Sequence, residues 1–152
     1  MEMEDDPPQE GELTSRAPTE DDLVALCRKL NELDAKYMIV GGFAIMYSGY
    51  GRSTTDVDLL MATDLENERK VYDTLATLPD QAVRELPPGE VEKYTVIRVA
   101  DEITVDLMKS ASGIDYAEAS KDIVMRRVQD VDIPHSVCFA PPSLSHEEEH
   151  LS

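Results

Sequence analysis

The sequence predicts an α+β fold in which one mixed β-sheet is flanked by helices within a single domain. Three observations predict this class: a helical apolar repeat over residues 23–33, strand-like alternation over residues 56–61, and a hairpin pattern over residues 94–108. The chain has 152 residues, 41% of them apolar, so it is long enough to bury a core of its own.

The N-terminal half of the predicted domain contains a helix, a strand, a glycine turn and a second helix. Apolar residues three and four apart over residues 23–33 form one buried stripe, and Thr19 can cap this helix. Residues 37–40 form a short buried strand. The glycine pair at 41–42 ends that strand, and residues 43–47 continue as a short helix.

The next segments predict further strands and helices. Residues 56–61 form a strand, and Asp64 can cap a helix that Pro79 stops, with Glu66 and Lys70 paired on its solvent side. The inward residues expected on this helix are Leu65, Tyr72, Leu75 and Leu78.

The C-terminal elements follow a turn at residues 87–89. Strands over residues 94–99 and 103–108 flank residues 100–102 as an antiparallel hairpin. A short helix over residues 115–121 and one strand within residues 123–131 complete the sheet.

Composition predicts two acidic tails around the domain. Residues 1–18 are rich in acids and proline and poor in apolar residues, which predicts a disordered tail. The folded domain is expected over residues 19–142, and residues 143–152 form a second acidic tail.

The charge balance excludes one class of partner. The formal net charge is −18, so electrostatic binding of nucleic acid phosphates is excluded as the main mode of action, and direct nucleic-acid binding is not expected. No apolar run approaches the ~20 residues of a membrane span. The acidic N-terminus does not resemble an export signal, and two widely separated cysteines suit reduced thiols in the cytoplasm.

Three aspartates carry the predicted chemistry. Residues two apart on a strand share a face, so Asp56 and Asp58 project together, with Cα atoms roughly 6.8 Å apart. Asp106 joins them if its strand is a neighbour. Three carboxylates about 5 Å apart repel by roughly 3 kcal/mol per pair at an effective dielectric of about 20, so a cation must compensate. Oxygen ligands favour Mg²⁺, so we expect magnesium here, as two ions.

The glycine pair supplies a second predicted feature. Gly41 and Gly42 let a ligand approach the backbone, and the following helix offers N–H groups to phosphate. Further candidates for phosphate contact are Arg52, Ser53, Thr54 and Thr55.

Residues 41–44 (GGFA), 52–59 (RSTTDVDL) and 104–107 (TVDL) together resemble the DNA polymerase beta-type nucleotidyltransferase superfamily, whose small bacterial members are the best match. The same residues are similar to antibiotic nucleotidyltransferases and to toxin–antitoxin nucleotidyltransferases. The resemblance covers roughly residues 37–108.

The resemblance implies a fold, a reaction and a set of roles. Asp56 and Asp58 would bridge two magnesium ions, and Asp106 would bind one of them and activate an acceptor hydroxyl. The glycine turn would hold a nucleoside triphosphate such as ATP, while Arg52 would clamp a phosphate. A nucleoside monophosphate would pass to a protein, an RNA end or a small hydroxylated molecule.

Alternatives of other classes stay open at this point. The chain could be an antitoxin-like module that binds a helical partner protein and keeps a vestigial or regulatory nucleotide site. A second copy of the chain could instead build the acceptor side. Asp-x-Asp alone also occurs in phosphatases and sugar transferases.

Several weaker signals have ordinary structural readings. Gly41 and Gly42 by themselves fit a plain strand-to-helix turn, and Lys93 and Arg98 fit a solvated hairpin face better than a substrate-facing one. The zinc-protease-like pattern at residues 146–150 reads as an acidic chain end.

Overall fold

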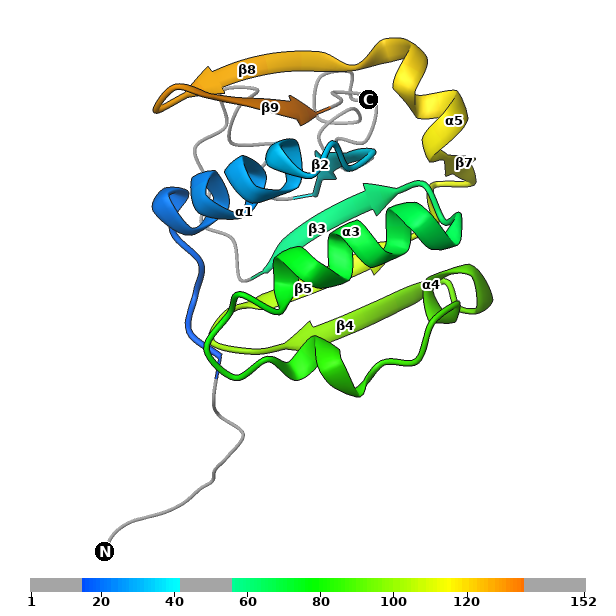
Figure 1. Cartoon of the computed structure of the whole chain (residues 1–152). Helices are drawn as coiled ribbons and strands as arrows, with labels where there is room; N and C mark the ends of the chain where they lie inside the picture. Colours follow the sequence, from blue (N-terminus) through cyan, green and yellow to red (C-terminus); the bar gives the residue numbers. More distant parts are fainter. Residues whose placement is uncertain (1–14, 42–55, 136–152) are drawn as a thin grey trace, which may run out of the picture.

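The computed structural model describes residues 15–41 and 56–135, in which six strands form one mixed sheet and two short strands form a separate pair (Figure 1). The strand order is β4-β5-β3-β2-β9-β8. In chain order the strands of the large sheet are β2 (Tyr37–Val40), β3 (Val57–Met61), β4 (Val96–Ala100), β5 (Thr104–Met108), β8 (Val124–Val128) and β9 (Val131–His135).

The central strands combine both pairing directions. Strand β2 is antiparallel to β3 and parallel to β9, while β3 is parallel to β5. The two outer pairs, β4 with β5 and β8 with β9, are antiparallel hairpins. The predicted α+β class with a mixed sheet is therefore confirmed.

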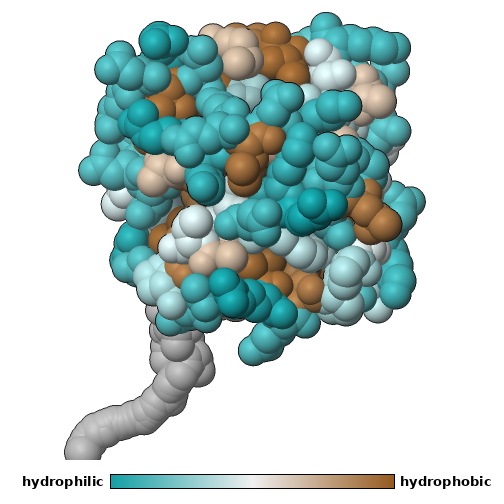
Figure 2. Space-filling view, viewed as in Figure 1, coloured by the Kyte–Doolittle hydropathy of each residue, from teal (hydrophilic) through white to brown (hydrophobic). Residues whose placement is uncertain are grey.

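Two helices, α1 (Glu20–Glu32) and α3 (Leu65–Leu75), cover one face of the sheet (Figure 1). The predicted cap of α1 is present, because the Thr19 hydroxyl accepts a hydrogen bond from the Asp22 amide. The main core lies between these helices and the sheet, and includes Leu23, Leu30, Leu59 and Leu107. The outer surface on this side is mainly hydrophilic, with separate apolar patches (Figure 2).

The buried side of α3 differs from the prediction. Asp64 caps the helix as expected, but Leu65 is 62% exposed, while Asn67 and Glu68 are buried. The Asn67 amide bonds to both backbone groups of Lys36. Buried positions of α3 are thus occupied by polar side chains that have hydrogen-bond partners, whereas the apolar pattern predicts Leu65 there.

The opposite face of the sheet carries a smaller core and the acidic residues. Met38, Val40 and Leu60 pack there against Ala119. The covering segments are β6 (Ser110–Ala111), β7 (Ile114–Asp115), α5 (Tyr116–Ala119) and the 3₁₀ turn η3 (Ser120–Asp122). Asp58 lies next to this small core, because Asp58 and Leu60 are two residues apart on β3 and share a face of the sheet.

Two strand predictions need correction. The hairpin loop comprises residues 101–103 rather than 100–102, because the Asp101 carboxylate and the Ile103 side chain are buried. The single strand expected within residues 123–131 is a hairpin of two strands, β8 and β9. Strand β9 lies largely beyond the predicted range and extends the sheet next to β2.

Two buried carboxylates organise the connection between α3 and β4, which contains η2 (Ala82–Glu85) and α4 (Glu90–Lys93). Glu68 accepts hydrogen bonds from the amides of Gly89 and Val91. Asp101 accepts hydrogen bonds from the amides of Asp80 and Ala82, as well as from that of its neighbour Glu102. The two carboxylates thus accept hydrogen bonds from backbone N–H groups that have no strand or helix partner in this irregular segment.

Residues 15–18 lie against the domain, whereas the sequence prediction included them in a disordered tail. The Arg16 amide donates to the carbonyl of Glu102, and its guanidinium forms a bidentate pair with Asp22 at 2.7 and 2.9 Å. None of the helices in the described residues is long and apolar enough to cross a membrane.

Candidate metal and nucleotide site

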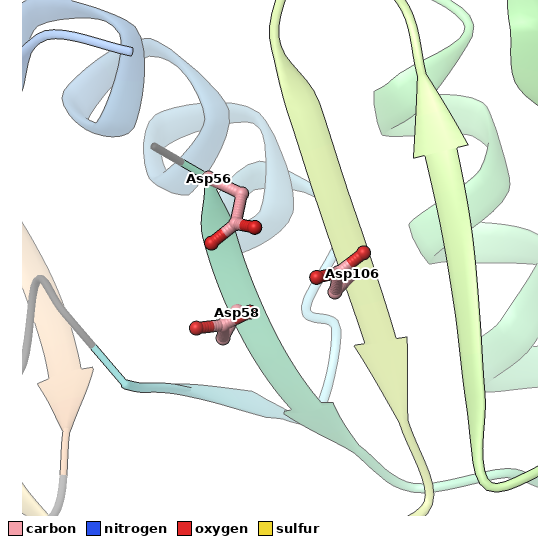
Figure 3. Close-up of side chains that lie close together, drawn as sticks. All are labelled: Asp56, Asp58 and Asp106. Atoms are coloured by element: carbon pink, nitrogen blue, oxygen red, sulfur yellow. The ribbon is translucent and has the colours of Figure 1, made fainter. Parts of the chain in front are cut away.

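Three aspartates meet on the face of the sheet opposite α1 and α3. Asp56 directly precedes β3, Asp58 lies within β3, and Asp106 lies within β5 (Figure 3). Asp58 and Asp106 are direct partners in the parallel register. Each of the three residues offers a carboxylate oxygen within 4.8 Å of the others. The predicted neighbour relationship between the two strands is confirmed.

Arg98 completes this group, although its place in the hairpin pattern predicts a solvated side chain. Arg98 is the antiparallel partner of Asp106 on β4. Its Nε and Nη2 atoms donate to the two carboxylate oxygens of Asp106 at 2.9 and 3.0 Å. Nη2 also donates to Oδ2 of Asp56 at 3.1 Å. The Arg98 side chain is 62% exposed, so it is solvated along much of its length, but its guanidinium belongs to the acidic site.

The acidic group has the electrostatics of a cation site. Burial, followed by the nearby charges of Asp56 and Asp106, raises the pKa of Asp58 to about 7. The pKa of Asp56 is also raised, mainly by burial and then by Asp106. Arg98 opposes both shifts and does not remove them. An additional positive charge at this position would therefore be stabilised.

The donor set fits magnesium. All three acidic side chains offer only oxygen, the ligand that hard divalent ions prefer, and the described part of the site contributes no sulfur or imidazole. Arg98 already holds three of the carboxylate oxygens as a cation would.

Gly41 has a structural reason to lack a side chain. Its φ of +74° lies in the left-handed region, and a Cβ atom would lie 2.0 Å from Oδ2 of Asp58. Among the described residues, the side chain of Asp58 takes the space next to Gly41. The predicted contact of Gly41 with a nucleotide stays a prediction.

The other predicted nucleotide-binding residues lie outside the described residues. These are Gly42, Arg52, Ser53, Thr54 and Thr55. The expected helix over residues 43–47 and the histidine pattern at 146–150 also lie outside them.

Two adjoining hollows of about 550 and 590 Å³ lie near the ends of β3 and β5. They share Thr63, Lys109 and Asp115 and are lined by none of the three aspartates. The first is also lined by Lys36 and Tyr116, so it presents amine and hydroxyl groups.

Comparison with known proteins supports the fold. No protein-family model matches the chain, and no curated protein is significantly similar in sequence. Solved structures do match, among them that of a presumed nucleotidyltransferase from Thermotoga maritima. The match has a TM-score of 0.53 and 11% identity over 87% of this chain and 88% of that one. At this identity the likeness shows a shared fold.

Proposed function

We propose that the protein is a magnesium-dependent nucleotidyltransferase that moves a nucleoside monophosphate from a nucleoside triphosphate to a hydroxyl acceptor. The observation that carries the proposal is the convergence of Asp56, Asp58 and Asp106 on one sheet face, with oxygens within 4.8 Å. The fold shared with the Thermotoga maritima protein supports it, and so does the sequence resemblance over residues 37–108.

The three aspartates would hold the ions, which supply Lewis-acid stabilisation of a triphosphate and lower the pKa of an acceptor hydroxyl. Strands β3 and β5 fix the carboxylates, since both are central strands of the sheet. The acceptor oxygen would form a bond to the α-phosphorus as the α–β anhydride bond breaks and pyrophosphate leaves. By resemblance, the hydroxyl proton would pass toward Asp106.

The finer assignments belong to the same proposal. Gly41, Gly42 and residues 52–55 would bind the triphosphate, within a catalytic domain spanning residues 19–142. The acceptor side would be completed by a helical partner protein or by a second copy of the chain, in the cytoplasm.

The test is incubation with labelled ATP, CTP, GTP and UTP and Mg²⁺, using wild type, Asp58→Asn and Asp73→Asn. Asp73 is an exposed carboxylate on α3, so its variant controls for the loss of one charge. Candidate acceptors are the chain itself, RNA ends and hydroxylated small molecules. We expect transfer by wild type and Asp73→Asn and a loss of at least ~100-fold in Asp58→Asn.

One observation favours a second candidate. Arg98 already neutralises part of the acidic group, so the site could persist without an ion in a binding module that has lost turnover. Binding of triphosphates without transfer to any acceptor, unchanged by Asp58→Asn, would favour that module over the enzyme.

A further inference from the structure

The guanidinium of Arg98 binds carboxylate oxygens that an ion held by the three aspartates would also use. It donates to both carboxylate oxygens of Asp106 and to one oxygen of Asp56. A divalent ion held by the same aspartates would lie within a few ångströms of this positive charge. Two cations at that separation repel strongly, even with partial solvent screening.

The two sides of this ion pair differ in freedom. The Asp106 side chain is 8% exposed and lies on a central strand, while the Arg98 side chain is 62% exposed on the edge strand β4. The guanidinium can therefore turn outward without disturbing the core, whereas the carboxylate cannot. Arg98 is therefore the partner of the pair that has room to change its rotamer.

If the Arg98 guanidinium leaves Asp106, it can bind the phosphate groups of a nucleotide instead. A nucleoside triphosphate bound through ions on the three aspartates brings phosphate oxygens to the same face of the sheet. The planar fork that binds Asp106 also matches the geometry of phosphate.

We propose that Arg98 is a positioning residue that neutralises the aspartates of the ion-free protein and transfers to the triphosphate when metal and nucleotide bind together. Binding of the ion and binding of the nucleotide are then positively coupled through one side chain. The inference rests on the proposed function, because it takes the three aspartates as the metal ligands.

The coupling has a distinctive signature in the Arg98→Gln variant. Mn²⁺ alone should bind more tightly than to wild type, by about 5- to 50-fold, because a competing cation is gone. The complex of Mn²⁺ with α,β-methylene-ATP should bind more weakly, by about 10-fold, because the phosphate partner is gone. A purely structural role would weaken both, and simple competition without transfer would strengthen both; either result overturns the proposal.

The measurement is electron paramagnetic resonance of Mn²⁺ together with calorimetry of the analogue complex. Arg127→Gln is the matched control, since Arg127 pairs with Asp132 at 2.9 Å and its side chain is 63% exposed. It should leave both affinities within about twofold of wild type. Arg98→Lys keeps the charge and loses the fork, so it should shift both affinities in the same directions by smaller factors, and it serves if Arg98→Gln does not fold.

Failure of the inference can be told from failure of the proposed function. If Asp58→Asn abolishes Mn²⁺ binding and Arg98→Gln does not tighten it, only the role of Arg98 is wrong. If wild type binds no Mn²⁺ that depends on Asp58, the metal site and the inference fall together.

Discussion

Gly41 and the carboxylate of Asp58 are so closely packed that no side chain fits at residue 41. The positive φ of Gly41 would strain any L-residue, and a Cβ atom would overlap Oδ2 of Asp58. The end of β2 and the central acid of the site are therefore coupled by steric fit. A change at residue 41 should therefore act on the candidate metal site through the position of the Asp58 carboxylate.

We predict that Gly41→Ala destabilises the protein by about 1–3 kcal/mol and weakens Mn²⁺ binding by at least ~10-fold. The first effect follows from backbone strain, and the second from displacement of the Asp58 carboxylate. Urea unfolding and Mn²⁺ resonance measure them separately. Gly113→Ala is the control, because Gly113 has a φ of +80° and open space around its Cβ position. That variant should lose stability and keep metal affinity; equal metal affinity in both variants would contradict the prediction.

Asp58 should make the ion-free protein less stable as the pH rises. Its folded-state pKa of about 7 lies above the ordinary 3.8, so its stabilising contribution is complete below pH 3.8 and is lost as the pH rises through about 7. We predict that the melting temperature in EDTA falls between pH 5.5 and 8.5 for wild type, by several degrees, and falls less for Asp58→Asn.

The pKa of His135 is lowered by burial and by the charge of Arg126, so its contribution to stability changes with pH in the opposite sense to that of Asp58. The difference between Asp58→Asn and wild type cancels this common contribution. Differential scanning calorimetry across the pH series measures the difference. Parallel curves for the two proteins would show that Asp58 does not titrate in this window.

Local elements could be predicted where one pattern dominates. The repeat over residues 23–33 and the cap at Thr19 identify α1, and the apolar run 37–40 identifies β2. The alternation after Asp56 identifies β3 and fixes which face its acids share. These predictions depend on neighbours in sequence, which a pattern can reveal.

The partner of Asp106 could not be predicted, because hairpin register depends on one residue of the loop. With residues 100–102 as the loop, Asp106 would oppose Val96; with 101–103 it opposes Arg98. The buried carboxylate of Asp101 selects the second register through backbone amides more than ten residues away. That information lies in tertiary contacts.

Strand β9 was missed for a similar reason. Pro134 and His135 make residues 131–135 a poor strand by pattern, yet Ile133, Pro134 and His135 are all buried. The strand forms because its hairpin with β8 delivers it to the open side of β2. Long-range pairing overrides the local preference here.

Asp101 provides a stability prediction independent of the site. The side chain is 1% exposed and accepts three backbone hydrogen bonds, which an asparagine amide cannot all accept. We predict that Asp101→Asn lowers the free energy of unfolding by about 2–3 kcal/mol. Urea denaturation measures this loss. Asp73→Asn, on the exposed side of α3, should change it by less than about 0.5 kcal/mol. A loss no larger than the control's would mean that the loop relaxes without these bonds.

Arg16 attaches residues 15–18 to the domain through Asp22. This ion pair should make the stability of the protein depend on pH in the acid range. The hydrogen-bonded guanidinium of Arg16 lowers the pKa of Asp22 from its ordinary value of 3.8 to about 2. A depressed carboxyl pKa contributes stability that is present above pH 3.8 and lost as the pH falls through about 2. We predict that Arg16→Ala raises the pKa of Asp22 toward its ordinary value and speeds exchange of the residue 16 amide.

Carbon-detected NMR titration of the Asp22 carboxyl gives the pKa, and hydrogen exchange gives the protection of the amide that bonds to Glu102. Arg127→Ala removes a comparably exposed pair with Asp132 and should change neither value. An unchanged Asp22 pKa in Arg16→Ala would leave its capping contact with Thr19 as the cause of the depression. Because the Arg16 side chain reaches both α1 and the β4–β5 loop, loss of amide protection without a pKa change would instead assign the attachment to Glu102.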